Sequence, residues 1–313
     1  TTTALPPHRV IYGHDPEEFL PVAADFVGLA RSTGLLPPQD FDAQKPSGLA
    51  LVAACAAGPS SPSSSASTSC SSRRRARGSP SFAPASRRSF RSALFRRASR
   101  AFAARLCDLD RMAEACDEVG AHLVHVSTDY VFNGEASTPY GEDHPTDPVN
   151  AYGASKLAGE VAAGAGATVV RSTWLQSADL PGMVGRVVDS LEAGVPIRVM
   201  DDRRACPTFV ADLAPVILRL GAERVTGVVH ATNAGVTSWH GFAREVARAS
   251  GHDPDTELLV PVSETDLDVS RPAHRPTYSA LDNTVLRGLG WEPMRHHRDA
   301  IAAVVARIMA AEA

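Results

Sequence analysis

Tyr152 and Lys156 lie four residues apart, and this pair offers the clearest chemistry in the chain. Residues at i and i+4 share one face of a helix, so the Lys156 ammonium is expected close to the Tyr152 phenol. A neighbouring positive charge lowers the pKa of a phenol from its usual value of about 10, which makes it a usable proton donor near neutrality. The spacing is therefore the one that reduction of a carbonyl group requires, although Tyr-x-x-x-Lys alone also occurs on ordinary surface helices.

Lysine usage in the chain strengthens the interpretation of Lys156. The sequence holds only two lysines, Lys45 and Lys156, so arginine supplies 29 of its 31 basic side chains. A surface helix in such a chain would be expected to carry arginine, and a planar guanidinium does not replace a compact ammonium. The alternative is a single stray lysine on the surface.

The elements that must position these residues are recognisable from residue 106 onward. Helical patterns cover 107–120, 152–164, 183–194, 212–222, 238–251 and 296–312, and short apolar runs typical of strands cover 122–128, 167–174 and 196–200. Short apolar strands that alternate with helices predict an α/β fold whose parallel sheet is covered on both faces. The first strand ends in a hydroxyl pair, Ser127 and Thr128, which precedes the helix of Tyr152 and Lys156.

The first third of the chain has a different character. Residues 1–47 are mixed and show no recognisable chemistry, so they stay unassigned. Residues 48–105 are rich in Ser, Arg and Ala and lack any sustained period of 2 or 3.6, so this low-complexity segment is expected to be disordered. It is either a genuine basic linker or coding sequence read in a shifted frame. The abrupt change of pattern near Leu106 favours the shifted frame.

Composition narrows the class of protein. No apolar run is long enough to cross a bilayer, and the N-terminus lacks the basic start and apolar stretch of a signal peptide. Five cysteines without metal-ligand spacing fit a reducing cytoplasm better than a disulfide framework. Between Asp42 and Asp108 the chain carries Lys45 and eleven arginines but no carboxylate. No stacking platform or binding fold accompanies these charges, so a nucleic-acid partner is not expected.

Six motifs, in order, resemble those of the dTDP-4-dehydrorhamnose reductase family, part of the extended short-chain dehydrogenase/reductase superfamily. They are STDYVFNG at 127–134, PVNAYGASKLAGE at 148–160, VVRSTWL at 169–175, DDRRACPTFVADLA at 201–214, GVVHATNAGVTSWHGFA at 227–243 and RPTYSALDN at 275–283. For residues 106–313 the resemblance implies a Rossmann-like doubly wound parallel sheet, with its first strands degenerate or missing, and a smaller C-terminal substrate-binding subdomain.

The resemblance also implies an activity and a catalytic set. The reaction would be reduction of the 4-keto group of a dTDP-4-keto-6-deoxyhexose, in dTDP-L-rhamnose or deoxysugar biosynthesis, by hydride from NADPH, with NADH as the alternative. Tyr152 would protonate the 4-keto oxygen, and Lys156 would assist it and hydrogen-bond the cofactor ribose. Thr128 would hold the keto oxygen, with Ser127 beside it among the cofactor contacts. The alternative for Thr128 is a strand-end hydroxyl that bonds the local backbone.

Three further residues would contact the sugar by the same resemblance. Tyr130 and Trp174 would line the sugar pocket, and Asp129 would accept hydrogen bonds from the substrate. Each has a plainer alternative: both aromatic side chains could belong to the core, and Asp129 could merely cap the turn that follows it. The partner implied is a dTDP-linked deoxysugar, with no membrane and no nucleic acid, and a homodimer is left open.

The sequence departs from the family's pattern in two places. No G-x-G-x-x-G or G-x-x-G-x-x-G occurs before residue 121, although the family opens with a glycine-rich turn that cradles the cofactor pyrophosphate. In addition, Arg203 stands where glutamine is usual and Ala205 where glycine is preferred. The two substitutions bear on the detail of substrate recognition. The missing glycine-rich turn favours a second hypothesis, a catalytically impaired relative that binds a nucleotide sugar or serves as a regulatory subunit.

Overall fold

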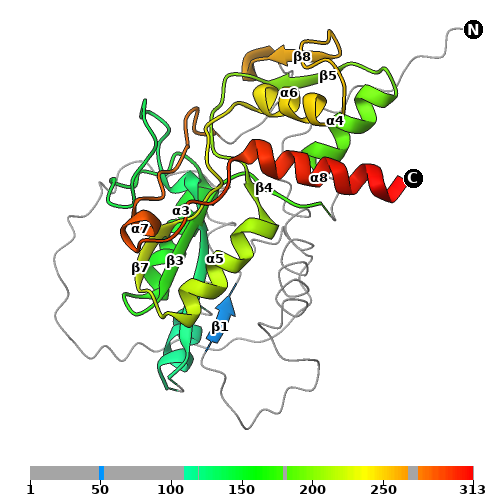
Figure 1. Ribbon diagram of the computed structural model, residues 1–313. Coiled ribbons are helices and arrows are strands. Elements are labelled where there is room, and N and C mark those ends of the chain that lie inside the picture. The colour runs from blue at the N-terminus through cyan, green and yellow to red at the C-terminus, as the bar shows by residue number, and fades with distance from the viewer. Residues whose placement is uncertain (1–48, 53–108, 119, 179–181, 267–273, 313) are drawn as a thin grey trace, which may run out of the picture.

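The computed structural model describes residues 49–52, 109–118, 120–178, 182–266 and 274–312 (Figure 1). The unassigned segment 1–47 lies outside the described residues. Of the segment 48–105, which was expected to be disordered, only Leu49–Val52 is described, and it forms a strand. The other predictions for the first third of the chain therefore fall on residues outside the description.

The main sheet has four parallel strands in the order β1-β2-β3-β7. They are β1 (Leu49–Val52), β2 (His122–Thr128), β3 (Thr168–Ser172) and β7 (Gly227–His230). Every residue of β3 is buried, as expected for a strand that is covered on both faces. The register places Ser127 of β2 beside Arg171 of β3, and Thr128 beside Ser172.

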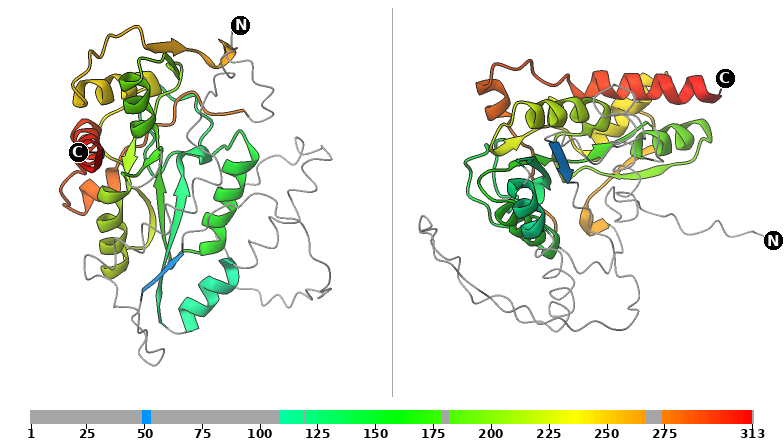
Figure 2. Two further views of the ribbon diagram at one scale, coloured as in Figure 1. Left: turned by 90° about the vertical axis from the view of Figure 1, so that its right-hand side faces the viewer. Right: turned by 90° about the horizontal axis from the view of Figure 1, so that it is seen from below.

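Helices cover both faces of this sheet, which confirms the doubly wound architecture expected from the sequence (Figure 2, left view). Because side chains alternate along a strand, Val124 of β2 packs in the core formed with α5 (Val210–Ala222), while Leu123 packs in the core on the opposite face. The helical residues 109–118 and α3 (Ala151–Ala163) lie on that opposite face, and α7 (Thr284–Gly288) lies on the α5 side.

The remaining elements build a second, smaller layer around a core of their own (Figure 1). The apolar faces of its three helices meet in this core, where Val187, Val246 and Ile301 are fully buried. Its elements are α4 (Met183–Glu192), β5 (Ile197–Met200), α6 (Trp239–Ala249), β8 (Leu259–Val262) and α8 (His297–Glu312). This layer matches the C-terminal subdomain expected from the sequence.

Two further pairs of short strands lie outside the main sheet. β4 (Leu175–Gln176) pairs in parallel with β6 (Thr208–Phe209), and β5 pairs in parallel with β8. Two 3-10 turns, η1 (Asp129–Val131) and η2 (Glu264–Asp266), complete the set. Among the described residues, no helix has the length and apolar character that crossing a membrane would need.

Candidate active site

Thr128 ends β2 at the carboxyl edge of the parallel sheet, the edge at which such sheets bind ligands. It caps η1, because its hydroxyl oxygen accepts a hydrogen bond from the Tyr130 backbone N–H at 3.3 Å. The same hydroxyl donates to Asp129 Oδ1 at 2.9 Å. The local backbone bond expected under the plainer alternative is therefore present, together with a side-chain bond that the sequence did not indicate.

The start of α3 places Tyr152 against η1. Asn150 caps the helix, with its Oδ1 accepting from the Gly153 backbone N–H at 2.8 Å. Gly153 permits a very close approach, because a Cβ at this position would lie 2.0 Å from the Tyr130 carbonyl oxygen. The rings of Tyr130 and Tyr152 meet edge to face, with centroids 5.8 Å apart. The half-buried Tyr152 side chain thus lies beside the turn that follows Thr128.

Lys156, one helical turn after Tyr152, faces β2. Its Nζ donates a hydrogen bond to the backbone oxygen of Val126 at 2.7 Å. The structure therefore brings the Tyr152 and Lys156 face of α3 to the strand end that carries Ser127 and Thr128. The chemical roles of these residues remain predictions.

Ser127 bonds a partner that sequence reasoning did not consider. Its Oγ donates to Glu160 Oε1 at 2.5 Å, and Glu160 is itself paired with Arg171 in the protein interior. Two signals could have pointed to this pair. Glu160 lies at the next i+4 position after Lys156, and Arg171 is the one charged residue of its short strand.

Asp129 is buried rather than placed at the surface of the turn. The Thr173 hydroxyl donates to its Oδ2 at 2.8 Å, while Thr128 bonds its Oδ1. Burial raises the pKa of Asp129 to about 6, although hydrogen bonds from Ser279, Thr173 and Thr128 oppose the rise. Asp129 therefore ties the end of β2 to the residues that follow β3.

Tyr130 is half-buried beside the catalytic candidates. Burial, reinforced by the Asp129 carboxylate, raises the pKa of Tyr130 to about 12, while the nearby guanidinium groups of Arg275 and Arg203 act in the opposite direction. Its phenol consequently stays protonated at neutral pH. The structure leaves Tyr130 adjacent to Tyr152, a position compatible with lining a pocket there.

Trp174 lies in the core of the smaller layer. It is 4% exposed, and its ring stacks on Trp239 at a centroid distance of 4.0 Å. Its φ of 45° falls in the left-handed region, which is uncommon for a bulky residue. This packing corresponds to the core-aromatic alternative stated above, and the contact of Trp174 with a sugar remains a prediction.

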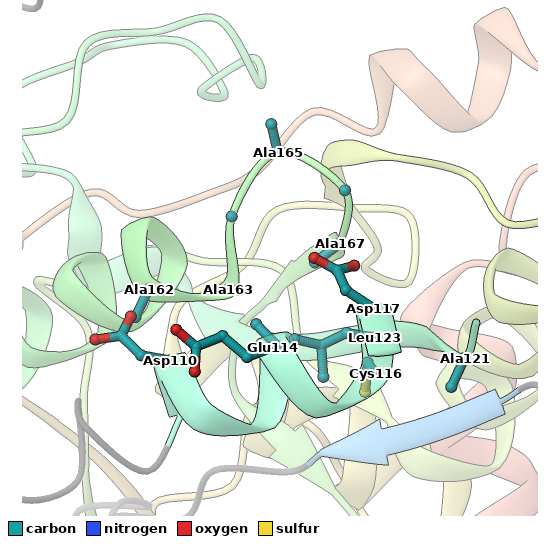
Figure 3. A pocket seen from close by; sticks show the side chains of 13 residues that line it. Asp110, Glu114, Cys116, Asp117, Ala121, Leu123, Ala162, Ala163, Ala165 and Ala167 are labelled. Atoms are coloured by element: carbon teal, nitrogen blue, oxygen red, sulfur yellow. The ribbon is translucent and has the colours of Figure 1, made fainter. Parts of the chain in front are cut away.

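A cavity of about 330 Å³ lies at the other end of the sheet (Figure 3). It opens between the helical residues 109–118 and the end of α3, near the amino ends of β2 and β3. Three carboxylates line it: Asp110, Glu114 and Asp117. The described residues contain no cluster of three or more side chains arranged to hold a metal ion. Because the cavity lies near the amino ends of the strands and Thr128 ends β2, the cavity is separate from the site around Thr128.

Residues 96–310 match the family model described as the RmlD substrate binding domain. The chain belongs to this family. Curated members of the RmlD family support the assignment, among them a "dTDP-4-dehydrorhamnose reductase" of Streptomyces griseus, 42% identical over 201 residues. That match covers 61% of this chain and 64% of the relative, so the chain spans slightly less than two-thirds of the relative's length. The resemblance inferred from the six motifs is confirmed.

Other relatives support the same family assignment. A "dTDP-4-dehydrorhamnose reductase" of Mycobacterium tuberculosis is 40% identical over 215 residues, covering 66% of this chain and 69% of the relative. Among solved structures, a dTDP-4-dehydrorhamnose reductase of Clostridium acetobutylicum aligns with a TM-score of 0.59 and 32% identity, over 64% of this chain and 71% of that one. The Bacillus anthracis reductase, solved in complex with NADP, aligns with a TM-score of 0.58 and 31% identity, over 64% and 70% respectively. The RmlD family thus shares this fold.

Proposed function

We propose that this chain reduces the 4-keto group of a dTDP-linked 4-keto-6-deoxyhexose, a step of deoxysugar biosynthesis. The observation that carries the proposal is the docking of α3 on the end of β2. The Lys156 bond to Val126 and the contact of Tyr152 with Tyr130 support the proposal, because Val126 and Tyr130 flank Thr128 in the chain. The names of the family members describe the same reaction class.

The protein groups divide the proton chemistry among them. Tyr152 transfers its phenol proton to the 4-keto oxygen, so the ketone becomes an alcohol as the carbon is reduced. Lys156, held at the strand by Val126, places a positive charge that favours the phenolate left behind. Thr128 supplies a hydroxyl that can donate to the keto oxygen when it turns from Asp129.

The cofactor proposed is NADPH, with NADH as the alternative, and it supplies a hydride when bound. The residues present fit its nicotinamide ribose end, because Tyr152 and Lys156 are both half-buried on one face of α3 at the ligand-binding edge of the sheet. An ammonium carries three N–H groups, so the Lys156 bond to Val126 is compatible with a bond to a ribose hydroxyl. Ser127 would lie next to that ribose.

NADPH absorbance in the presence of a dTDP-4-keto-6-deoxysugar tests the proposal directly. The wild-type chain should oxidise NADPH, and Tyr152→Phe should lower kcat by about 10²- to 10⁴-fold, the usual contribution of a positioned proton donor. Lys156→Arg keeps the charge but not the compact ammonium, and it should also lose most activity. Turnover by Tyr152→Phe at the wild-type rate would remove Tyr152 from the mechanism.

A second candidate is a relative that binds a nucleotide sugar without reducing it. The printed sequence lacks the glycine-rich turn before residue 121, and this observation favours such a protein. Titration calorimetry separates the two functions. A binding protein would take up the dTDP-sugar with no measurable NADPH affinity, whereas a reductase binds both.

A further inference from the structure

Glu160 continues the face of α3 that carries the two catalytic candidates. It follows Lys156 by four residues, as Lys156 follows Tyr152, so the three side chains form one stripe along the helix. The Glu160 residue is 9% exposed. A buried carboxylate on the stripe of a catalytic helix needs a structural explanation, because a buried charge is costly unless it is paired.

Three hydrogen bonds satisfy this carboxylate. Ser127 Oγ donates to Oε1 at 2.5 Å, and Arg171 Nε donates to the same oxygen at 2.9 Å. Arg171 Nη2 donates to Oε2 at 2.6 Å, so the guanidinium and the carboxylate form a bidentate pair with two hydrogen bonds. Such two-point pairs fix geometry more strictly than a single contact does.

The two donors come from neighbouring strands at the same level of the sheet. Ser127 of β2 and Arg171 of β3 are paired directly in the parallel register, one step before the pair of Thr128 and Ser172. A single Glu160 carboxylate therefore joins α3 to both strands immediately beneath the candidate active site. The side chains of the ion pair are only 5% and 6% exposed, so little solvent screens the interaction.

We propose that Glu160 is a positioning residue for the reduction proposed above. Through Ser127 and Arg171 it fixes how far α3 slides along β2 and how the helix is rotated. This orientation sets the distance between the Tyr152 phenol and the Thr128 hydroxyl. The inference rests on the proposed function for its catalytic consequence, whereas the anchoring of the helix is independent of it. A buried ion pair of this kind often adds little stability, and its value here lies in specifying one geometry.

The substitution Glu160→Gln tests the proposal. Glutamine keeps the shape and one oxygen acceptor but loses the charge and the bidentate pair with Arg171. We expect kcat to fall by about 10- to 100-fold with KM nearly unchanged, because a displacement near 1 Å can cost this much in rate. Arg171→Lys, which keeps the charge and loses the fork, should act in the same direction and serves if the first variant does not fold. Leu220→Ala is the control: Leu220 is 0% exposed and packs on the α5 side of the sheet, opposite α3, so the substitution lowers stability and should leave kcat unchanged.

A second readout does not depend on turnover. The chain has only two lysines, so ¹³C-methylation of its amines gives, apart from the signal of the N-terminal amine, NMR signals assignable to Lys45 and Lys156. Glu160→Gln should shift the Lys156 signal and leave that of Lys45 in place. A wild-type chain without reductase activity, but with this shift, would refute the proposed function and support the anchoring role. An unmoved Lys156 signal together with wild-type kcat in Glu160→Gln would overturn the role of Glu160.

Discussion

Asp129 is 1% exposed and holds its carboxyl group among hydroxyl donors. Because burial raises its pKa from 3.8 to about 6, the folded protein binds this proton more tightly than the unfolded chain does. The resulting stabilisation is complete below about pH 3.8 and is lost as the pH rises through 6. Above pH 6 the ionised Asp129 therefore lowers the free energy of unfolding relative to a neutral group of the same shape.

Asp129→Asn should consequently change stability in a pH-dependent manner. The free energy of unfolding of the variant, relative to wild type, should increase by about 1–3 kcal/mol between pH 4 and pH 7.5, since one pKa unit corresponds to about 1.4 kcal/mol. Urea unfolding at the two pH values measures this difference. A difference that does not vary with pH would show that Asp129 does not carry the titration.

The catalytic candidates could be found from the sequence, while the residues that hold them could not. Tyr152 and Lys156 share a helix face by spacing alone, so local periodicity was sufficient. Glu160 has the same periodicity, but its meaning depends on Arg171, which only the packing of α3 on the sheet brings to it. The position of Trp174 could not be predicted in this way. A tryptophan that follows a strand can line a pocket or pack in the core, and its stacking on Trp239 depends on tertiary structure.

At the scale of elements, the contact between α3 and η1 depends on one glycine. A Cβ at Gly153 would stand 2.0 Å from the Tyr130 carbonyl oxygen, which is backbone and cannot turn aside. Gly153→Ala must therefore move the helix or the turn, and we expect it to lower the free energy of unfolding by about 1–3 kcal/mol. The same shift should reduce NADPH oxidation, because Tyr152 follows the helix.

Gly185 provides the matched control for this prediction. It lies inside α4, and nothing stands within 4 Å of a Cβ at this position. Gly185→Ala should raise stability by roughly 0.5–1 kcal/mol, since alanine loses less backbone entropy in a helix. Thermal unfolding of both variants gives the comparison. Equal effects of the two substitutions would show that the fit between α3 and η1 is looser than the geometry indicates.

The longer elements followed from sequence periodicity, and the shorter ones did not. The helix of α6 and the strand β2 have strong, regular apolar patterns and lie where they were expected. The strands β4 and β6 contain two residues each, which is too few to show a period. The strand β8 includes Pro261, and a proline inside a short apolar run argues against a strand. These strands form because neighbouring segments supply hydrogen-bond partners, and that information is not local.

At the scale of the whole molecule, buried histidines in the main sheet link folding to pH, and two of them have the largest shifts in pKa. His125 of β2 and His230 of β7 are 1% and 0% exposed. Within the described part of the chain, neither ring nitrogen of His125 has a hydrogen-bond partner. Burial, with a contribution from Lys156 at His125 and from Arg171 at His230, lowers the pKa of each to about 3. Both imidazoles are therefore neutral in the folded protein at neutral pH.

The direction in which these histidines change stability with pH follows from the difference between their pKa values in the folded and unfolded states. The unfolded chain protonates these histidines near pH 6.5, well before the folded protein does, so their contribution to stability is present above pH 6.5 and is lost as the pH falls toward 3. Asp129 acts in the opposite direction between pH 6 and 3.8, but its shift is smaller than either histidine shift. The molecule should thus lose stability steadily on acidification, with the strands β2 and β7 at the origin of the loss.

The substitution His125→Leu measures how much His125 contributes to the pH dependence of stability. Leucine has a similar volume and no ionisable group, and it replaces a ring whose nitrogens have no described hydrogen-bond partner, so the substitution should be tolerated. Relative to wild type, the variant should gain free energy of unfolding on the order of a few kcal/mol between pH 8 and pH 5. The exposed His274 supplies the control, because His274→Gln should leave the pH dependence unchanged. If His125→Leu retained the wild-type slope of stability against pH, acid sensitivity would have to arise from His122, from His230 or from charges outside the sheet.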